Sequence, residues 1–521
     1  MGHAPSLDPA SLQVLLSRLA GVADEMGAVL VRSASSPNIK ERRDCSAAVF
    51  TADGELLAQA EHIPVHLGSM PASVRAAVAS LGGRPPRPGE HLVLNDPFAG
   101  GTHLNDLTLV SPAFVGERLV GWVATRAHHA DVGGAAPGSM PPDAVEVHQE
   151  GLRLPPMPYT PEVKAVLLAN TRTPEERAGD LDAQEGANRV GVARLAALAD
   201  EEAFAEVLAY GERRMRAALA ALPDGTFTFA DVIDSTGPRP EQRRPARIAV
   251  RIEVRGDAVE VDFTGTEAQR PGNVNAVEAV TVSAVAFALR AVLDPTLPAN
   301  GGLMRPVTIV VPRGSIVGAE PPVAVGAGNV EVSQRVADVC LGALAQACPD
   351  RVGAAGQGTM NNVLLGGRGW VSYETLAGGQ GGRPGRPGMS AVHTAMTNTR
   401  NTPIEALERS FPLRVLRYRV RQGSGGAGRW AGGDGLERDL QVLEDVTLSL
   451  IGERRDRGPW GLAGGEPGAP GEDWLLPGGD EAAAVRLADK GTVELKAGDV
   501  LRMRTPGGGG WGPARDGAGR R

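Results

Sequence analysis

The chain has 521 residues, of which 42% are hydrophobic and 22% charged, and its formal net charge is −8. These proportions are typical of a globular protein and argue against a disordered, collagenous or membrane-embedded chain. Because no basic block interrupts the mild acidity, we expect no nucleic-acid partner, while the 69 glycines and 40 prolines predict long, ordered loops.

The first element expected is an amphipathic helix that begins just after Asp8. Asp8 is a favourable N-cap, and Pro9 suits the first helical position because its missing N–H would have no partner there. From Leu12 to Leu30 the apolar residues recur at helical spacing. The pattern therefore predicts a helix with one face buried against the rest of the protein.

A β-rich region is expected after the first helix. Residues 46–50 and 55–58 flank an Ala-Asp-Gly step, which favours a tight hairpin turn. Short apolar runs predict three more strands, at residues 91–95, 107–110 and 119–125. We therefore expect strands through much of residues 45–126, with loops at their ends.

Helical and mixed segments follow further along the chain. Residues 188–222 are rich in helix-forming side chains and end at a Pro-Asp-Gly turn. Beyond that turn the patterns predict a hairpin of residues 248–254 and 259–263 and a buried helix at residues 276–293. From about residue 418 onward, short strands alternate with glycine-rich turns.

These elements predict a mixed α/β (α+β) fold in a large, multi-lobed globular subunit. We expect three units. Residues 1–222 would hold the first helix, the β-rich region and a helical segment. Residues 223–415 would form a mixed region with glycine-rich loops, and residues 416–521 a β-rich C-terminal unit.

Histidines are concentrated in the β-rich region. Seven of the nine fall within residues 62–148, namely His62, His66, His91, His103, His128, His129 and His148. His103 and Asp106 lie three residues apart in an expected loop between strands, and His128, His129 and Asp131 follow the next predicted strand. Imidazole and carboxylate groups together suit Zn, Mn or Fe. The cluster therefore predicts one divalent metal site, the alternative being that these side chains are hydrogen-bonded loop residues.

His62 and His66 form a second pair within the same region. Their spacing of four residues resembles that of helical metal ligands, but Pro64 between them argues against such a helix. We expect these two histidines to line a pocket, to support the metal ligands, or to satisfy loop carbonyls.

The sequence carries no nucleotide-binding signature of its own. A P-loop motif is absent, and the Gly-Gly-Gln-Gly-Gly run at residues 378–382 predicts only a flexible loop. If the protein uses ATP, another chain must bring it. The longest apolar run, residues 279–289, is far shorter than the roughly 20 residues that span a bilayer, and three cysteines without a pairing pattern favour the reducing cytoplasm. We therefore expect no membrane association.

Several long motifs resemble those of the hydantoinase B/oxoprolinase family. At the N-terminus these are residues 25–34 (EMGAVLVRSA), 36–46 (SPNIKERRDCS), 62–70 (HIPVHLGSM), 95–98 (NDPF), 100–106 (GGTHLND) and 128–131 (HHAD). Later segments that resemble the family are residues 262–266 (DFTGT), 271–275 (PGNVN), 373–374 (YE), 378–382 (GGQGG) and 505–511 (TPGGGGW). The resemblance covers almost the whole chain.

The resemblance implies the catalytic, metal-bearing subunit of the hydantoinase B type in an ATP-dependent cyclic amidase. Its substrates would be hydantoin, N-methylhydantoin, 5-oxoproline or a related lactam, and its partner a hydantoinase A-type subunit that binds ATP, in a hetero-oligomer such as a heterotetramer. Carried over residue by residue, the metal ligands would be Asp44, His103, Asp106 and His128. Asp44 is assigned by the resemblance alone.

The implied mechanism divides the work between two subunits. The partner would phosphorylate the amide oxygen, and water held by the divalent ion would then open the activated ring. His62, His66, His129 and Asp131 are candidates for proton transfer or for orienting the ligands. Two alternatives remain, a ketone carboxylase subunit and a non-catalytic scaffold for the ATPase subunit; carboxylase members of the family tend to be longer, which favours hydrolysis.

Overall fold

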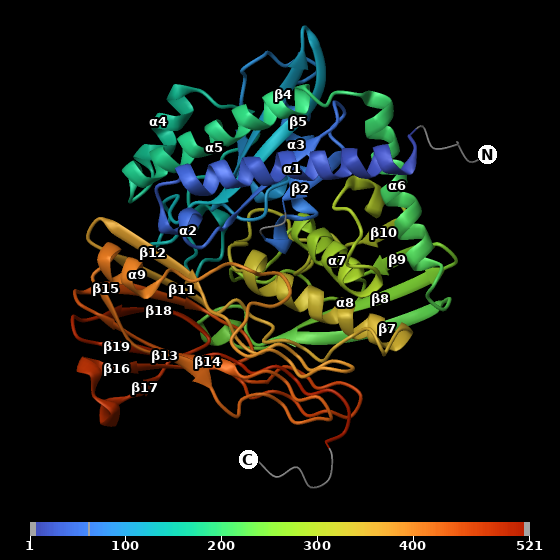
Figure 1. The fold of residues 1–521 in the computed structure, drawn as a ribbon. Coiled ribbons are helices and arrows are strands. Elements are labelled where there is room, and N and C mark those ends of the chain that lie inside the picture. The colour runs from blue at the N-terminus through green and yellow to red at the C-terminus, as the bar shows by residue number, and fades with distance from the viewer. Residues whose placement is uncertain (1–6, 61–62, 515–521) are drawn as a thin grey trace.

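The computed structural model describes residues 7–60 and 63–514, and it consists of helices packed on four β-sheets (Figure 1). Helix α1 (Pro9–Ser33) begins as the sequence predicts, because the Asp8 side chain accepts hydrogen bonds from the amides of Ala10 and Ser11. The mixed α+β class expected from the sequence is confirmed. None of the described helices has the length and apolar character needed to cross a membrane.

The first sheet contains six strands in the order β2-β1-β5-β4-β3-β6. Its strands are β1 (Cys45–Phe50), β2 (Leu56–Ala60), β3 (Leu92–Leu94), β4 (Asp106–Val115), β5 (Arg118–His128) and β6 (Met157–Pro158). The hairpin and the three further strands predicted from sequence are all confirmed. Because side chains alternate along a strand, Ala47 and Val49 pack with α1 on one face while Ala48 and Phe50 pack with α3 on the other.

Helices cover both faces of this first sheet. Helix α1 packs against α5, and α5 crosses β4 and β5 (Figure 1). The remaining helices of this half are α2 (Pro37–Lys40), α3 (Ser69–Ser80), α4 (Pro161–Ala169), α5 (Pro174–Ala196) and α6 (Glu201–Leu219). The sheet is therefore buried on both sides, which explains why nearly all residues of its long strands are inaccessible to solvent.

The second sheet has the order β10-β9-β8-β7; helix α8 packs on β7 and β8, and helix α7 packs on α8. Its strands are β7 (Gly225–Ile233), β8 (Ala246–Arg255), β9 (Ala258–Asp262) and β10 (Val307–Val310), and the helices are α7 (Glu278–Leu293) and α8 (Ser333–Ala347). The predicted hairpin and buried helix are both present. A single π-helical turn, Gly328–Val332, leads into α8.

Two further sheets form the C-terminal part of the protein. One has the order β12-β11-β15-β18 and the other β13-β14-β19-β16-β17. The strands are β11 (Asn362–Gly367), β12 (Trp370–Thr375), β13 (Leu413–Arg421), β14 (Gly435–Val442), β15 (Val446–Ile451), β16 (Glu472–Leu476), β17 (Val485–Arg486), β18 (Lys490–Leu495) and β19 (Val500–Arg504), and the helix is α9 (Ile404–Ser410). Strands from both sides of residue 416 share one sheet, and the three-unit division stays a prediction.

Four glycine-rich segments lie side by side next to these sheets, and we call them the glycine bundle: residues 378–388, 424–433, 458–468 and 505–512 (Figure 1, lower right). Their backbones hydrogen-bond to one another, for example from Gly508 to Gly433 and from Gly382 to Gly509. A Cβ atom on Gly508 would lie only 2.1 Å from the Gln380 carbonyl oxygen. The expectation of a flexible loop at 378–382 is therefore wrong, because this segment is packed between other backbones.

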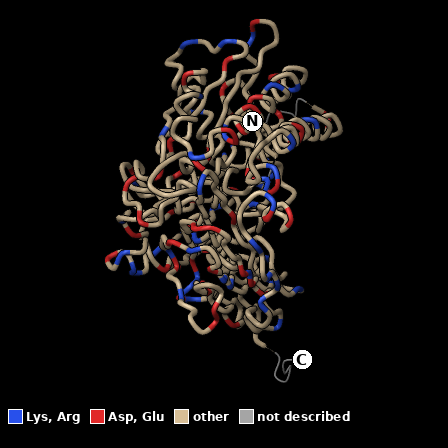
Figure 2. Tube along the Cα trace, turned by 90° about the vertical axis from the view of Figure 1, so that its left-hand side faces the viewer, with Lys and Arg blue, Asp and Glu red and all other residues tan. Residues whose placement is uncertain are grey.

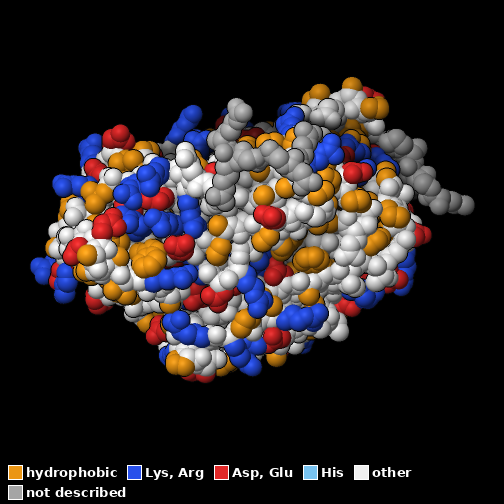
Figure 3. Space-filling view, turned by 90° about the horizontal axis from the view of Figure 1, so that it is seen from below, with side chains coloured by type: hydrophobic (Ala, Val, Ile, Leu, Met, Phe, Trp, Pro, Cys, Tyr) orange, Lys and Arg blue, Asp and Glu red, His pale blue; other side chains and the backbone are white. Residues whose placement is uncertain are grey.

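Charged side chains are interspersed along the chain trace. Lys and Arg alternate with Asp and Glu in Figure 2, and the face seen from below in Figure 3 shows basic and acidic side chains next to one another. Ion pairs such as Arg502–Glu481 and Arg417–Glu437 account for part of this pattern in the last sheet.

Candidate metal centre

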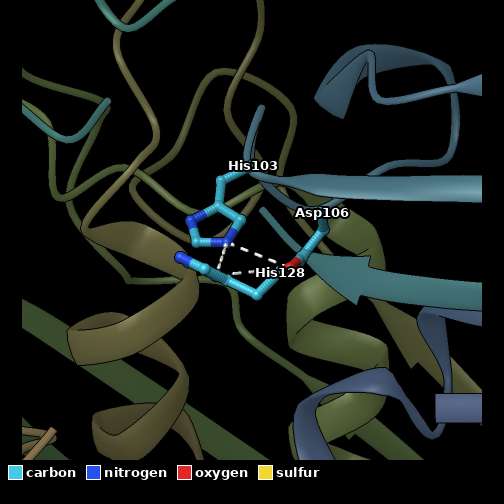
Figure 4. Close-up of side chains that lie close together, drawn as sticks. All are labelled: His103, Asp106 and His128. Carbon is cyan, nitrogen blue, oxygen red and sulfur yellow. Dashed lines mark hydrogen bonds and ion pairs between the residues drawn. The ribbon is translucent and has the colours of Figure 1, made fainter. Parts of the chain in front are cut away.

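Three side chains of the β4–β5 hairpin and its entry loop converge at the open end of the hairpin (Figure 4). Asp106 is the first residue of β4 and lies directly across from His128, the last residue of β5. His103 is brought back to them by a turn in which the Asp106 amide donates to the His103 carbonyl oxygen at 3.1 Å. Antiparallel pairing thus brings Asp106 to His128, and the turn adds His103, which is 25 positions from His128 in the sequence.

The candidate ligand atoms form a nearly equilateral triangle. His103 Nε2 lies 3.2 Å from His128 Nδ1 and 3.3 Å from Asp106 Oδ1, and the third side, from His128 Nδ1 to Asp106 Oδ1, is 3.5 Å. Two atoms each about 2 Å from one ion, at a tetrahedral angle, are about 3.3 Å apart. The donor set of two imidazoles and one carboxylate fits Zn, Mn or Fe, and these three residues form the metal-type group found in the described ranges 7–60 and 63–514.

Asp106 is held so that one carboxylate oxygen stays available. Its Oδ2 accepts a hydrogen bond from the Thr102 hydroxyl and lies 3.4 Å from both Asn329 Nδ2 and His66 Nε2, whereas its Oδ1 has no hydrogen-bond partner in the described parts of the chain. Burial alone would raise the pKa of Asp106, but His103 and His66 beside it bring that pKa well below its ordinary value. The carboxylate is therefore ionised, as a metal ligand must be.

His103 is oriented by a backbone carbonyl. Its Nδ1 lies 3.1 Å from the Gly326 oxygen, which can only accept a hydrogen bond, so Nδ1 carries the proton and Nε2 presents a lone pair toward Asp106 and His128. Burial opposes protonation of His103, but the Asp106 carboxylate outweighs it and raises the pKa of the imidazole. A cation at Nε2 would take the place of that additional proton.

His128 is oriented by an aromatic ring from the C-terminal part of the protein. The Tyr373 ring of β12 stacks on the imidazole at 4.7 Å between ring centroids, and the Arg42 guanidinium lies 4.6 Å from the centroid of the Tyr373 ring. The Asn38 amide donates to the His128 backbone oxygen. Burial lowers the pKa of His128 to about 3, so its ring is neutral and able to bind a metal.

Asp44, the fourth ligand implied by the family resemblance, lies next to this group without joining the triangle. Its backbone oxygen accepts a hydrogen bond from the His128 amide at 3.0 Å, and its carboxylate is 3.9 Å from Arg42. Burial, only partly offset by Arg42, raises the pKa of Asp44 to about 7. The role of Asp44 as a ligand stays a prediction.

Of the two histidines around Pro64, His62 lies outside the described residues and His66 reaches the site. His66 ends a short 3₁₀ turn, Pro64–His66, in agreement with the argument from Pro64 against a longer helix. Its Nε2 faces Asp106 at 3.4 Å and its Nδ1 lies 2.9 Å from the Ser46 hydroxyl. His66 therefore contacts Oδ2 of the candidate ligand Asp106, not the Oδ1 atom that faces His103 and His128.

His129 and Asp131 are not brought to the three-residue group. His129 Nε2 bonds Gln184 of α5 at 2.9 Å, and burial lowers the pKa of His129 to about 4. Both Asp131 oxygens accept hydrogen bonds, from the amides of Gly133 and Gly138 and from Arg172. These contacts favour a role in ordering the loop after β5 over a role in proton transfer.

The sequence reasoning missed several side chains that surround the site. Asn329 and Glu331 come from the π-helical turn, and Glu331 accepts from Asn362 Nδ2 at 2.7 Å while Tyr373 donates to Asn362 Oδ1 at 2.9 Å. Burial raises the pKa of Glu331 to about 8. Tyr373 stood in one family motif, but no local signal relates the other residues to a histidine cluster more than 200 positions away.

A surface cavity of about 660 Å³ is lined by none of the three candidate ligands, but two of its walls belong to segments that lead to the centre. It is bounded by α3, residues 97–100, the start of α7 and residues 311–321. Two of its walls, at Gly68 and Gly100, continue directly into the segments that carry His66 and His103. Its volume is in the range of small-molecule sites.

Comparisons with known proteins agree with the motifs described above. The family model described as hydantoinase B/oxoprolinase matches residues 8–514. The chain is 37% identical to 5-oxoprolinase 1 of Arabidopsis thaliana, a match that covers 97% of this chain but only 42% of that protein. It is 33% identical to a protein of Pseudomonas sp. (strain NS671) named as the putative B-type subunit of a D-/L-hydantoinase, with 97% and 90% coverage.

One solved structure is also closely similar. The ATP-dependent caprolactamase from Pseudomonas jessenii superposes with a TM-score of 0.89 at 27% identity, over 98% of this chain and 92% of that one. The similarity therefore extends from the first helix to the glycine bundle.

Proposed function

This chain belongs to the hydantoinase B/oxoprolinase family, and from that premise we propose that it is the metal-bearing catalytic subunit of an ATP-dependent cyclic-amide hydrolase. The observation that carries the proposal is the triangle of His103, Asp106 and His128, whose ligand atoms lie 3.2–3.5 Å apart in a buried site. The proposed substrates are small cyclic amides such as 5-oxoproline, hydantoins or lactams.

A second subunit of the hydantoinase A type would supply ATP. Well over half of the Arabidopsis 5-oxoprolinase lies outside the match with this chain, which leaves room for an ATP-binding part, and the Pseudomonas relative is itself named as a subunit. This chain has no P-loop motif. We therefore propose a hetero-oligomer in which the partner phosphorylates the amide oxygen and so removes the resonance that protects the amide.

A divalent ion bound by His103, Asp106 and His128 would lower the pKa of water enough to supply a nucleophile at neutral pH. The chain's own residues prepare for this chemistry. Asp106 stays ionised, the Gly326 carbonyl fixes the tautomer of His103, and burial keeps His128 neutral. Asp44 is proposed as the fourth ligand, as the family resemblance implies.

Among the candidates for proton transfer, His66 has the most suitable position. Burial lowers its pKa, so it is neutral, with Nε2 facing the Asp106 carboxylate and Nδ1 facing the Ser46 hydroxyl. It can hold Asp106 in orientation and exchange a proton at Nε2. His129 and Asp131 are engaged by α5 and by the loop after β5, so we assign them the ordering of that loop.

The test is to purify the chain together with its A-type partner and to supply ATP with hydantoin, 5-oxoproline or caprolactam. We expect ring opening coupled to ADP formation, lost after chelation and restored by one divalent ion per chain. ATP-dependent carboxylation of a ketone with bicarbonate, without ring opening, would replace the proposal by the carboxylase alternative. Unchanged turnover of an intact complex carrying His103→Ala would show that the chain is a scaffold.

A further inference from the structure

Glu150 is a buried carboxylate whose oxygens are held by backbone amides. Its side chain is 1% exposed, and no Lys or Arg of the described ranges 7–60 and 63–514 lies within ion-pair distance of it. Its oxygens accept hydrogen bonds only from backbone amides, those of Val325 at 3.0 Å and Gly326 at 2.7 Å. Buried charges are ordinarily paired or coordinate metals, so this arrangement needs an explanation.

The two amides held by Glu150 belong to the turn that orients His103. The Gly326 N–H donates to Glu150 Oε1, and the Gly326 carbonyl oxygen accepts from His103 Nδ1 at 3.1 Å. A carboxylate, one glycine and an imidazole thus form a chain of contacts in which Glu150 fixes the position of Gly326 and Gly326 orients the His103 ring. The chain ends at His103 Nε2, the atom that faces Asp106 and His128.

The surrounding backbone holds this turn at both ends and leaves its two central amides to Glu150: beyond Gly326, the Ala327 amide donates to the Asn273 oxygen at 2.8 Å. Val147 donates to the Pro322 oxygen at 2.8 Å and Ala324 donates to the Val145 oxygen at 3.1 Å, which ties residues 322–324 to residues 145–147. Beyond Ala324, the amides of Val325 and Gly326 are held by Glu150. A Cβ atom on Gly326 would come within 3.0 Å of Glu150 Oε1, so a glycine suits this close approach.

We propose that Glu150 is a positioning residue of the metal centre: it fixes the Val325–Gly326 backbone and thereby the tautomer and direction of His103, and the bound divalent ion is the counter-charge that Glu150 otherwise lacks. This inference rests on the proposed function, because it requires that the three-residue group holds a metal. Burial, opposed by the two amides and by His103, raises the pKa of Glu150 to about 7.

The test uses Co²⁺ as the probe, because its visible absorption reports the ligand geometry. The full-length chain and its Glu150→Gln variant are titrated with Co²⁺. We expect the variant to bind about 10–100-fold more weakly, the effect typical of outer partners of metal ligands, and to show a shifted absorption spectrum. Asp439→Asn is the matched control, since Asp439 is also buried, at 4% exposed, but is paired with Arg502 in the last sheet.

The outcomes distinguish the role of Glu150 from the presence of the metal centre itself. Co²⁺ affinity within twofold of the wild type, together with an unchanged spectrum, would overturn the role of Glu150 while leaving the metal centre intact. A wild-type chain that binds no Co²⁺ would refute the proposed function itself. If Glu150→Gln does not fold, Glu150→Asp keeps the charge but draws the carboxylate back by one methylene; wild-type affinity in that variant would equally overturn the proposal.

Discussion

The metal centre and the glycine bundle are built on opposite principles. In the metal centre, three side chains of defined chemistry meet because Asp106 and His128 are register partners across β4 and β5. In the glycine bundle the contacts are between backbones, and a Cβ atom on Gly381 would lie 1.8 Å from the Ala354 oxygen. One region depends on which side chains are present, the other on side chains being absent.

The two regions therefore tolerate different kinds of substitution. A ligand can be replaced by a residue of similar size without disturbing the fold, because β4 and β5 stay paired along their whole length. A glycine of the bundle has no such freedom, since any added atom displaces a neighbouring backbone that is itself hydrogen-bonded. Substitutions in the first region should therefore change chemistry, and those in the second should change stability.

The largest effect is expected for His128→Gln. Loss of one corner of the triangle should abolish stoichiometric metal binding and reduce ATP-dependent ring opening more than the 10–100-fold typical of outer partners. Metal content by elemental analysis and turnover of the complex measure both effects. His148→Gln is the control, because His148 is an exposed histidine of the same sequence window and should leave both quantities unchanged.

A wild-type metal content in folded His128→Gln would contradict this prediction, because it would show that the metal centre does not depend on the His128 imidazole. Thermal unfolding of the metal-free variant distinguishes this result from a fold that has been lost. We expect little change there, because β5 retains its backbone pairing up to residue 128.

The next effect is expected for Gly508→Ala in the glycine bundle. Its Cβ would meet the Gln380 carbonyl oxygen at 2.1 Å, and the backbone on both sides is hydrogen-bonded, so the free energy of unfolding should fall by about 3 kcal/mol or more. Gly491→Ala is the control, because no atom lies within 4 Å of its added Cβ. Urea denaturation of both variants measures the difference. Equal urea midpoints would show that the glycine bundle accommodates the added methyl group.

The sequence predicts those parts of both regions that depend on local pattern. The Asp8 cap, the hairpin of β1 and β2, and a His/Asp cluster containing His103, Asp106 and His128 could be predicted from spacing and residue type, whereas the choice of these three among the residues of the cluster came from the family resemblance. Because hairpin pairing places the ends of adjacent strands side by side, histidines and carboxylates at two such ends predict a cluster from the sequence alone.

The features that the sequence does not predict depend on contacts between distant segments. Glu150 reaches His103 through Gly326, and Tyr373 stacks on His128 from another sheet, so neither leaves a periodic signal near the histidines. The glycine bundle was missed for a related reason. A run of glycines is compatible with both a flexible loop and a packed one. In this protein the segment at residues 378–382 is packed because other segments of the glycine bundle hydrogen-bond to its backbone.

Tyr373 links the two regions, and its substitution gives the smallest effect expected here. The residue lies on β12, five positions before the glycine bundle, and its ring contacts both His128 and Arg42. The ring restrains the imidazole, whereas the hydroxyl donates a hydrogen bond to Asn362 Oδ1.

Tyr373→Leu should therefore weaken Co²⁺ binding about tenfold, at the lower end of the range for outer partners. Tyr373→Phe, which keeps the ring, should bind Co²⁺ within about threefold of the wild type. Equal losses in the two variants would show that the hydroxyl and its contact with Asn362 position His128, and no loss in either would mean that the metal centre is independent of the C-terminal sheets.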